Sequence, residues 1–479
     1  MLPDPQKRRN LLYINQGVDK NNVPHFKEMA AEYGLADTTY STMAAFFDYD
    51  NDGDLDMYLT VNEILPKDNP SQYRRIITDG SFPSTGRLYR NDWNDSLKHP
   101  VFTDVSKQAG ITIEGYGHGA TIADFNKDGW KDIYVSNDFL SCDILYINNH
   151  DGTFTDKARS YFKHTSYNSM GQDVEDINND GLEDLITLDM NPEDNYRKKT
   201  MLAPVAYRSY QNNDNYGYQY QYVRNALQLN QGKRSSQNDS SGAPIFSDIS
   251  FYSGVAETDW SWTPMVADFN NDGSRDIIVT NGFPKDITDR DFMNFRQESY
   301  GIASKSQLLR QIPEVKLKKY AFKNDSNLKF SDVTENWGIQ MPSFSNGAAY
   351  ADLDNDGDLD CVINNINDEA FVYENTTNTK NKISANYLAI KFKGGKNNVN
   401  GLGAWAEIYY NKDQEQVYEN NPYRGYLSSI EAKAFFGLGA VTTVDSLIIR
   451  WPGNKKQVLR NVKADQLLTV DIKDATLED

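Results

Sequence analysis

The chain has 479 residues, enough for two or more domains with a sizeable core. It carries 68 acidic and 49 basic residues, a net charge of -19, and its one basic run near the start, Lys7-Arg8-Arg9, is short. Because phosphate binding needs clustered lysine and arginine, this composition excludes a nucleic-acid-binding protein. No stretch is apolar enough to span a membrane, and the first residues are not those of a signal peptide.

Five copies of one acidic loop dominate the chain, each with the pattern D-x-[DN]-x-D-G-x-x-D. We number them loops 1 to 5; they occupy residues 48–56, 124–132, 176–184, 268–276 and 352–360. Side-chain oxygens at positions 1, 3, 5 and 9 suit calcium, which takes roughly 6–8 oxygen ligands, and position 7 can add a backbone carbonyl. The glycine at position 6 permits a sharp turn.

We therefore predict about five calcium ions, which would bring the net charge from -19 to about -9. The predicted metal positions are Asp48, Asp50, Asp52, Asp54, Asp56, Asp124, Asn126, Asp128, Trp130, Asp132, Asp176, Asn178, Asp180, Leu182, Asp184, Asp268, Asn270, Asp272, Ser274, Asp276, Asp352, Asp354, Asp356, Asp358 and Asp360.

These loops are not EF-hands, which need a bidentate glutamate at position 12 on a following helix. Position 12 is instead Leu59, Val135, Thr187, Val279 or Ile363. Short β-branched and aromatic runs follow each loop, and small or apolar runs precede most of them, so each loop is predicted to join two strands. Loop 3 is the least typical, because the polar run Gln172-Asp173-Val174-Glu175 precedes it.

A larger repeat surrounds each loop. The strand after the loop is followed by a segment such as Ile144-Leu-Tyr-Ile-Asn148, and then by a second signature such as Val101-Phe-Thr-Asp-Val105. The unit is thus four short strands, with the acidic loop between the first and second. Repeated units of this kind indicate an all-β propeller. Insertions are predicted at 61–86, 191–222 and 285–318, the last partly helical.

The C-terminal part is predicted to be a small β domain, because four alternating segments are separated by glycine and asparagine clusters. These segments are 387–392, 404–410, 446–450 and 466–470. Arg424 and Arg450 are candidates for binding an anion or a glycan, although a structural arginine that binds loop carbonyls is the more ordinary interpretation. Of the two cysteines, Cys361 is expected to be a buried free thiol.

The loops, with their Gly119-Ala-Thr-Ile-Ala-Asp124 type of lead-in, resemble the FG-GAP/VCBS repeats of integrin-like propellers. The C-terminal motifs Gly401-Leu-Gly-Ala404, Arg424-Gly-Tyr-Leu-Ser-Ser429, Phe436-Gly-Leu-Gly439 and Arg450-Trp-Pro-Gly453 resemble the ASPIC/UnbV domain. The combination resembles a large group of Bacteroidetes surface or secreted proteins. The resemblance covers roughly 11–375 and 384–471, and it implies a seven-bladed ring, calcium ligands at positions 1, 3, 5 and 9, and an extracellular or cell-surface location.

Leu11-Leu-Tyr-Ile-Asn15 and His25-Phe-Lys-Glu-Met29 match the third and fourth strands of a blade whose first two strands are missing. Loop 5 is followed by a third strand but by no clear fourth. We expect an N-terminally truncated piece of a larger ring; the alternative is a six-bladed ring closed by the two chain ends. The expected domains are 1–36, a partial blade; 37–380, five calcium-loop blades; and 381–479, the ASPIC/UnbV-like domain.

Tyrosines gather in the second insertion. If Tyr216, Tyr218, Tyr220 and Tyr222 lie on a strand they share one face, which makes them, with Arg424, the candidate ligand surface. The alternative is that this face packs on the propeller rim. No catalytic constellation is recognised among the five histidines, and His118 is the most notable of them.

Three functional interpretations remain. The first is an extracellular propeller scaffold, with structural calcium, that binds a glycan or protein at the cell surface. The second is a polysaccharide lyase or hydrolase built on a calcium propeller. The third is a spacer with no ligand. The sequence does not indicate an oligomeric state.

Overall fold

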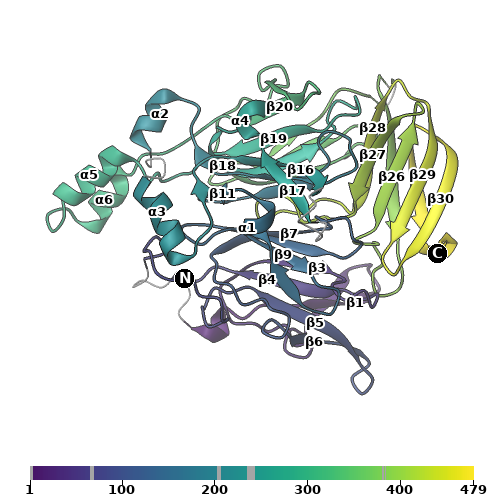
Figure 1. Cartoon of the computed structure of the whole chain (residues 1–479), viewed down its shortest axis with the longest axis horizontal. Helices are drawn as coiled ribbons and strands as arrows, with labels where there is room; N and C mark the ends of the chain where they lie inside the picture. Colours follow the sequence, from purple (N-terminus) through teal and green to yellow (C-terminus); the bar gives the residue numbers. More distant parts are fainter. Residues whose placement is uncertain are drawn as a thin grey trace.

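The computed structural model describes residues 4–64, 69–201, 207–234, 243–379, 382 and 384–478. Small β-sheets make up most of it, in agreement with the all-β prediction (Figure 1). The chain first forms a row of blade-like sheets and then a pair of C-terminal sheets, drawn in yellow and green. No helix in the described part of the chain is long and apolar enough to cross a membrane.

The chain opens with an antiparallel hairpin and continues with blade-like sheets in which successive strands are neighbours. The hairpin is β1 (Tyr13–Val18) and β2 (Pro24–Glu28). The first blade is β3 (Ser41–Phe47), β4 (Asp56–Val61), β5 (Arg87–Asn94) and β6 (His99–Asp104). The second is β7 (Gly117–Ala123), β8 (Asp132–Asn137), β9 (Ile144–Asn148) and β10 (Phe154–Asp156).

The remaining blades follow the same order with insertions between strands. The third is β12 (Gln172–Glu175), β13 (Asp184–Thr187), β16 (Ala226–Lys233) and β17 (Pro244–Asp248). The fourth is β18 (Asp259–Ala267), β19 (Asp276–Asn281), β20 (Tyr320–Asn324) and β21 (Phe330–Asp332), with β14 (Met190–Asn191) paired to β18. The fifth is β22 (Ser345–Ala351), β23 (Asp360–Asn365) and β24 (Phe371–Tyr373).

Apolar side chains fill the space between neighbouring blades. Phe125 and Tyr134 of the second blade, for example, pack with Val174 and Leu185 of the third in one buried cluster. The first strands lie next to one another in the order β3, β7, β12, β18 and β22. This face-to-face packing around a set of inner strands is a propeller-like arrangement. Among the described residues there are five such blades and one hairpin, fewer than the seven blades that the resemblance implies.

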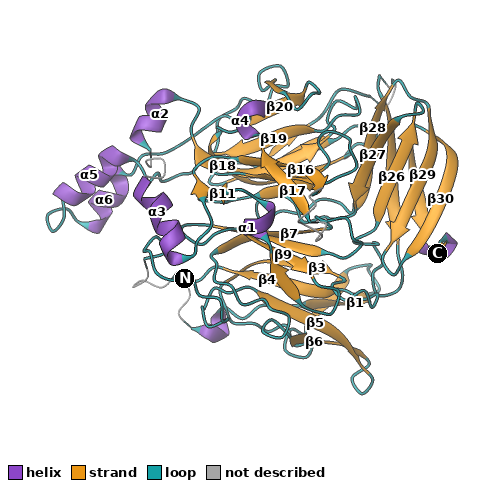
Figure 2. Ribbon diagram, in the orientation of Figure 1, coloured by secondary structure: helices purple, strands orange, loops and turns teal. Residues whose placement is uncertain are grey.

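Helices occur in the insertions rather than in the blades (Figure 2). Those of the second and third insertions lie on the side of the molecule opposite the C-terminal sheets: α2 (Asn195–Thr200), α3 (Tyr207–Tyr216), α5 (Arg290–Glu298) and α6 (Lys305–Gln311). Shorter elements are α1 (Ala158–Tyr161), α4 (Ser250–Ser253), the 3-10 turns η1 (Pro5–Lys7) and η2 (Ile472–Asp474), and the parallel pair β11 (Thr165–Ser166) and β15 (Gln221–Tyr222). Of the first insertion, 62–64 and 69–86 contain neither helix nor strand.

The C-terminal part is two sheets around one apolar cluster that includes Ile390, Ala406, Phe436 and Leu447. The first sheet has the order β28 (Lys433–Gly439), β25 (Asn386–Lys393) and β31 (Gln466–Asp471). The second is β27 (Gln414–Glu419), β26 (Trp405–Tyr410), β29 (Thr443–Trp451), β30 (Lys455–Lys463) and β32 (Thr476–Leu477). The four predicted strands are present as β25, β26, β29 and β31.

Residues 419–430 leave β27 and run across the inner strands of the blades; we call this segment the strap. Its successive contacts reach all five blades. They are Phe46 N to Tyr423 Oη at 2.7 Å, Thr121 Oγ1 to Tyr423 O at 3.0 Å, Gly425 N to Gln172 O at 2.7 Å, Tyr426 N to Thr263 Oγ1 at 3.0 Å and Ala348 N to Ser428 Oγ at 3.3 Å. The C-terminal part thus supplies the packing at the centre of the propeller.

Candidate metal centres

Each acidic loop joins the first and second strands of a blade, as predicted from the flanking residues. Position 9 begins the second strand in every copy, from Asp56 in β4 to Asp360 in β23. Position 6 is a glycine with φ between 79° and 93°. Position 4 is also left-handed, with φ of 54–61° at Asn51, Lys127, Asn179, Asn271 and Asn355. Asparagine tolerates this conformation, which explains why it fills four of the five positions.

The position-1 carboxylate holds the turn closed. Asp48 accepts hydrogen bonds from the backbone N–H groups of Asp52 at 3.1 Å and Gly53 at 3.0 Å. The other four loops repeat both bonds, through Asp124, Asp176, Asp268 and Asp352. The protein itself therefore holds each loop closed, through its position-1 carboxylate and two backbone N–H groups.

The position-9 carboxylate ties the loop to the third strand of its blade. Asp132 accepts from Phe125 N at position 2 (3.1 Å) and from Asn148 N at the end of β9 (2.8 Å). Asp56, Asp184, Asp276 and Asp360 repeat this pair of bonds. The third-strand asparagine in the sequence repeat is thus a fixed partner of the loop.

That same asparagine also connects neighbouring blades; we call this contact the clasp. Asn148 Nδ2 donates to Lys131 O of its own loop at 3.3 Å and to Tyr49 O of the preceding loop at 2.8 Å. Asn230, Asn324 and Asn375 do the same with Phe125, Ile177 and Phe269 of the preceding loops. The five loops are therefore one connected structure rather than separate turns.

Loops 1 and 5 bring carboxylate oxygens close together. One oxygen each of Asp48, Asp50 and Asp56 lie within 4.8 Å of one another, and so do those of Asp352, Asp354 and Asp356. Several buried oxygens at positions 3, 5 and 7 have no hydrogen-bond donor among the described residues: Asp50 Oδ1, Asp54 Oδ1, Asn126 Oδ1, Asp356 Oδ1 and Asp358 Oδ1. Buried acceptors without donors are costly, so an all-oxygen set of this kind fits a calcium ion.

Asp48, Asp54 and Asp56 of loop 1 resist ionisation. Burial, followed by the charges of Asp52 and Asp50, raises the pKa of Asp48 to about 6, and burial with the same neighbours raises that of Asp54 to about 7. Burial raises the pKa of Asp56 to about 8. Asp54 and Asp358 place side-chain carboxylates at position 7, where the sequence prediction relied on a backbone carbonyl. A cation inside the loop would relieve this crowding.

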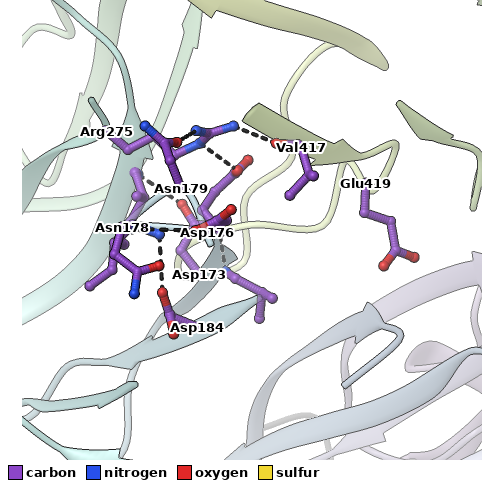
Figure 3. A network of polar contacts seen from close by, with 12 residues as sticks. Asp173, Asp176, Asn178, Asn179, Asp184, Arg275, Val417 and Glu419 are labelled. Atoms are coloured by element: carbon purple, nitrogen blue, oxygen red, sulfur yellow. Dashed lines mark hydrogen bonds and ion pairs between the residues drawn. The ribbon is translucent and has the colours of Figure 1, made fainter. Parts of the chain in front are cut away.

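Loops 3 and 4 contain a protein cation as well. Buried Arg275, at position 8 of loop 4, donates to Glu175 Oε2 at 2.9 Å, to Asn179 Oδ1 of loop 3 at 3.0 Å and to Val417 O of β27. Figure 3 shows its guanidinium between Asn179 and Val417, close to Asp176. Burial raises the pKa of Asp176 to about 6, and Arg275 opposes that rise. The polar lead-in of loop 3 therefore serves to bind arginines.

Arg424 is not part of a ligand surface, contrary to that prediction. It is 3 % exposed, and its Nη1 lies 2.9 Å from Asp173 Oδ1 and 2.7 Å from Glu175 Oε1. Its guanidinium Nε also donates to Asn421 O, as the ordinary structural interpretation expected. Its role is to attach the strap to β12.

The tyrosines do not form an alternating strand face, because helix α3 extends to Tyr216 and Gly217 (φ 88°) ends it. Tyr218 is buried and donates to Glu114 Oε1 at 2.9 Å. Tyr220 stacks on Tyr210 of α3 with ring centroids 4.5 Å apart, and Tyr222 pairs with Ser166 in the parallel pair of β15 and β11. Tyr218 packs the insertion onto the blades, in line with the alternative interpretation, whereas Tyr216 is exposed.

Other sequence predictions can be located in the structure. Cys142 and Cys361 are buried free thiols. His118 is largely buried against Tyr426 of the strap, and burial lowers its pKa to about 4. Sequence reasoning did not identify the residues that bring the C-terminal sheets against loops 1 and 2, such as Lys131, which pairs with Glu419 at 2.6 Å. Lys131 is a charged residue at position 8 of loop 2, and this was the sequence feature that could have pointed to the contact.

Comparison with known proteins supports the C-terminal prediction. Residues 394–477 match the family described as ASPIC and UnbV, which confirms the ASPIC/UnbV-like domain at this end of the chain. No curated protein matches the chain. Among solved structures, one titled for specific recognition of non-reducing terminal N-acetylglucosamine by an Agrocybe aegerita lectin is similar, with 13% identity, a TM-score of 0.29, and coverage of 78% of this chain and 92% of that one.

Proposed function

We propose that this protein is an extracellular, calcium-stabilised propeller scaffold of the FG-GAP/VCBS type that recognises a glycan or a protein at the cell surface. The observation that supports it best is the set of buried oxygens without donors in loops 1, 2 and 5, inside turns that the position-1 carboxylates already hold closed. Calcium has a structural role here, and each loop binds about one calcium ion.

The extracellular location in this proposal follows from the calcium affinity expected of such loops. Extracellular calcium modules bind at about 10⁻⁴–10⁻³ M, so such sites fill outside cells and empty inside them. A calcium-dependent fold of this kind is therefore most stable where calcium is in the millimolar range. Recognition is assigned to the surfaces that the loops and the C-terminal sheets build together.

The test is to count bound calcium by elemental analysis and to record thermal unfolding with excess calcium and with excess chelator. We expect close to five ions per chain and a large loss of melting temperature on chelation. Each site stabilises the fold by about 2.7 kcal/mol when free calcium is 100-fold above Kd. Magnesium at equal concentration is the control, because it fits flexible multi-oxygen loops poorly. No bound calcium and no shift would contradict the proposal.

A further inference from the structure

A cavity of about 710 Å³ lies where loops 1 and 2 meet the C-terminal sheets. Asp48 and Asp124 line it from the loops, Trp405 and Glu407 from β26, and Trp451 from β29. Small-molecule sites typically occupy roughly 300–1,000 Å³ and lie between domains, so this cavity has the size and the position of a ligand site.

Aromatic side chains form much of the cavity wall. Trp130, at position 7 of loop 2, is partly exposed and stacks on His150 with ring centroids 4.8 Å apart. Trp405 lies across from loop 2, with Lys127 Nζ 5.4 Å from its ring centroid. Flat aromatic faces offer a large contact area to the apolar C–H faces of a rigid ring ligand.

Fixed polar groups lie between the aromatic ones. The Glu407 carboxylate accepts from Trp405 Nε1 at 3.1 Å, from Tyr409 Oη at 3.3 Å and from Arg450 Nε at 3.4 Å, so its position is determined before any ligand arrives.

Several of the charged side chains in the cavity wall are already paired, while Lys127 lies over the Trp405 ring and Lys455 also lines the wall. Arg450 pairs with Glu407 and Glu478, and Lys131 pairs with Glu419. An anionic ligand would have to compete with these carboxylates, whereas a neutral ligand leaves the pairs intact. The remaining acids, Asp48, Asp124 and Asp128, belong to the calcium loops, so calcium would neutralise the loop side of the cavity.

We propose that this cavity binds a neutral saccharide, with a sugar ring against the tryptophan walls and its hydroxyl groups on the fixed polar atoms. The inference rests on the proposed role as a glycan-recognising scaffold and gives that role a position and a ligand class. It places recognition between the propeller and the C-terminal sheets rather than on the tyrosine-rich insertion.

The experiment uses the full chain in excess calcium. Binding is measured to immobilised neutral oligosaccharides ending in glucose, galactose, mannose or N-acetylglucosamine, beside uronic-acid and sulfated oligosaccharides, and then by calorimetry for any that bind. We expect a neutral oligosaccharide to bind and to change tryptophan fluorescence. Trp130→Ala should weaken that binding at least tenfold, because it removes one aromatic wall but keeps the backbone carbonyl at position 7.

Trp93→Ala is the matched control, since Trp93 is an exposed tryptophan of β5 outside the cavity. It should leave the affinity unchanged, and calcium counting with thermal unfolding shows that each variant is folded. Neutral-glycan binding that Trp130→Ala does not weaken would overturn the cavity assignment while glycan recognition stands. Binding confined to acidic oligosaccharides would overturn the neutral class. A folded, calcium-loaded protein that binds no glycan would overturn both this inference and the glycan arm of the proposed function.

Discussion

Loop 1 contains five aspartates, whereas loop 4 contains three aspartates and an arginine. Both have the same backbone hydrogen bonds at positions 1 and 9 and the same left-handed residues. Loop 1 crowds its carboxylates without a cation of its own, while Arg275 in loop 4 pairs with Glu175 just before loop 3 and opposes the rise in the pKa of Asp176 in loop 3. The same loop backbone therefore carries two arrangements of charge. In loop 1 the carboxylates depend on a bound ion for neutralisation, whereas in loop 4 an arginine of the protein supplies part of it.

Removing the buried arginine of loop 4 should destabilise the protein most. Arg275→Met leaves Glu175 and the neighbouring loop acids short of a buried partner, so in excess calcium we expect a loss of about 3–5 kcal/mol in the free energy of unfolding. Urea unfolding measures it. Lys323→Met is the control, because Lys323 pairs with Asp272 at 3.2 Å from a half-exposed position, and it should cost less than about 1 kcal/mol. Equal losses for the two variants would show that burial of Arg275 is unimportant.

The clasp is made by Asn148 of the second blade, whereas Asn91, its equivalent in the first blade, bonds within its own blade. Asn148→Ala removes donors from the carbonyls of both Lys131 and Tyr49, and we expect a loss of about 1–3 kcal/mol in the free energy of unfolding. Asn91→Ala is the matched variant, since in the described part of the chain Asn91 Nδ2 donates within its own blade alone, to Leu55 O at 3.0 Å. Its loss should be about half as large, by the same urea measurement. A larger effect at Asn91 would contradict the role of the clasp between blades.

The smallest effect is expected at position 7, where loop 1 has Asp54 and loop 4 has Ser274. Asp54→Ser gives loop 1 the residue of loop 4; it should weaken calcium binding about tenfold, or about 1.4 kcal/mol, by calorimetry. With chelator present the same variant should raise the melting temperature, because it removes a half-buried acid whose pKa is raised to about 7. Ser274→Asp should have the opposite effect in both conditions. A change of the same sign with and without calcium would contradict a cation at this position.

Much of the propeller part is predictable from local sequence. The glycine at position 6, the acids at fixed spacing and the β-branched runs after them act within one turn or one strand, so they predict the loops, the flanking strands and the four-strand unit. For the tyrosine-rich insertion only the strand-face interpretation was wrong: its alternating pattern favoured a strand, whereas Gly217 ends a helix there and Tyr218 finds a buried partner in Glu114, as the packing interpretation expected.

The rest depends on residues far apart in the chain. Nothing near Arg424 indicates that it pairs with Asp173 and Glu175, about 250 positions earlier, and nothing near Trp130 indicates that Trp405 lies across from it. Such contacts arise when the strap and β26 reach the blades. The polar lead-in of loop 3 was a visible anomaly, and its explanation is the two arginines that it binds.

The strap also has a consequence for how the protein is made. Its residues come after every blade in the chain, yet they touch the inner strand of each one. A growing chain therefore reaches its last blade with the middle of the propeller still lacking the segment that packs there. Until residues 419–430 have been synthesised, the buried acids Asp173 and Glu175 lack Arg424. The blades, in the first four-fifths of the chain, therefore cannot complete their packing before the last fifth is made.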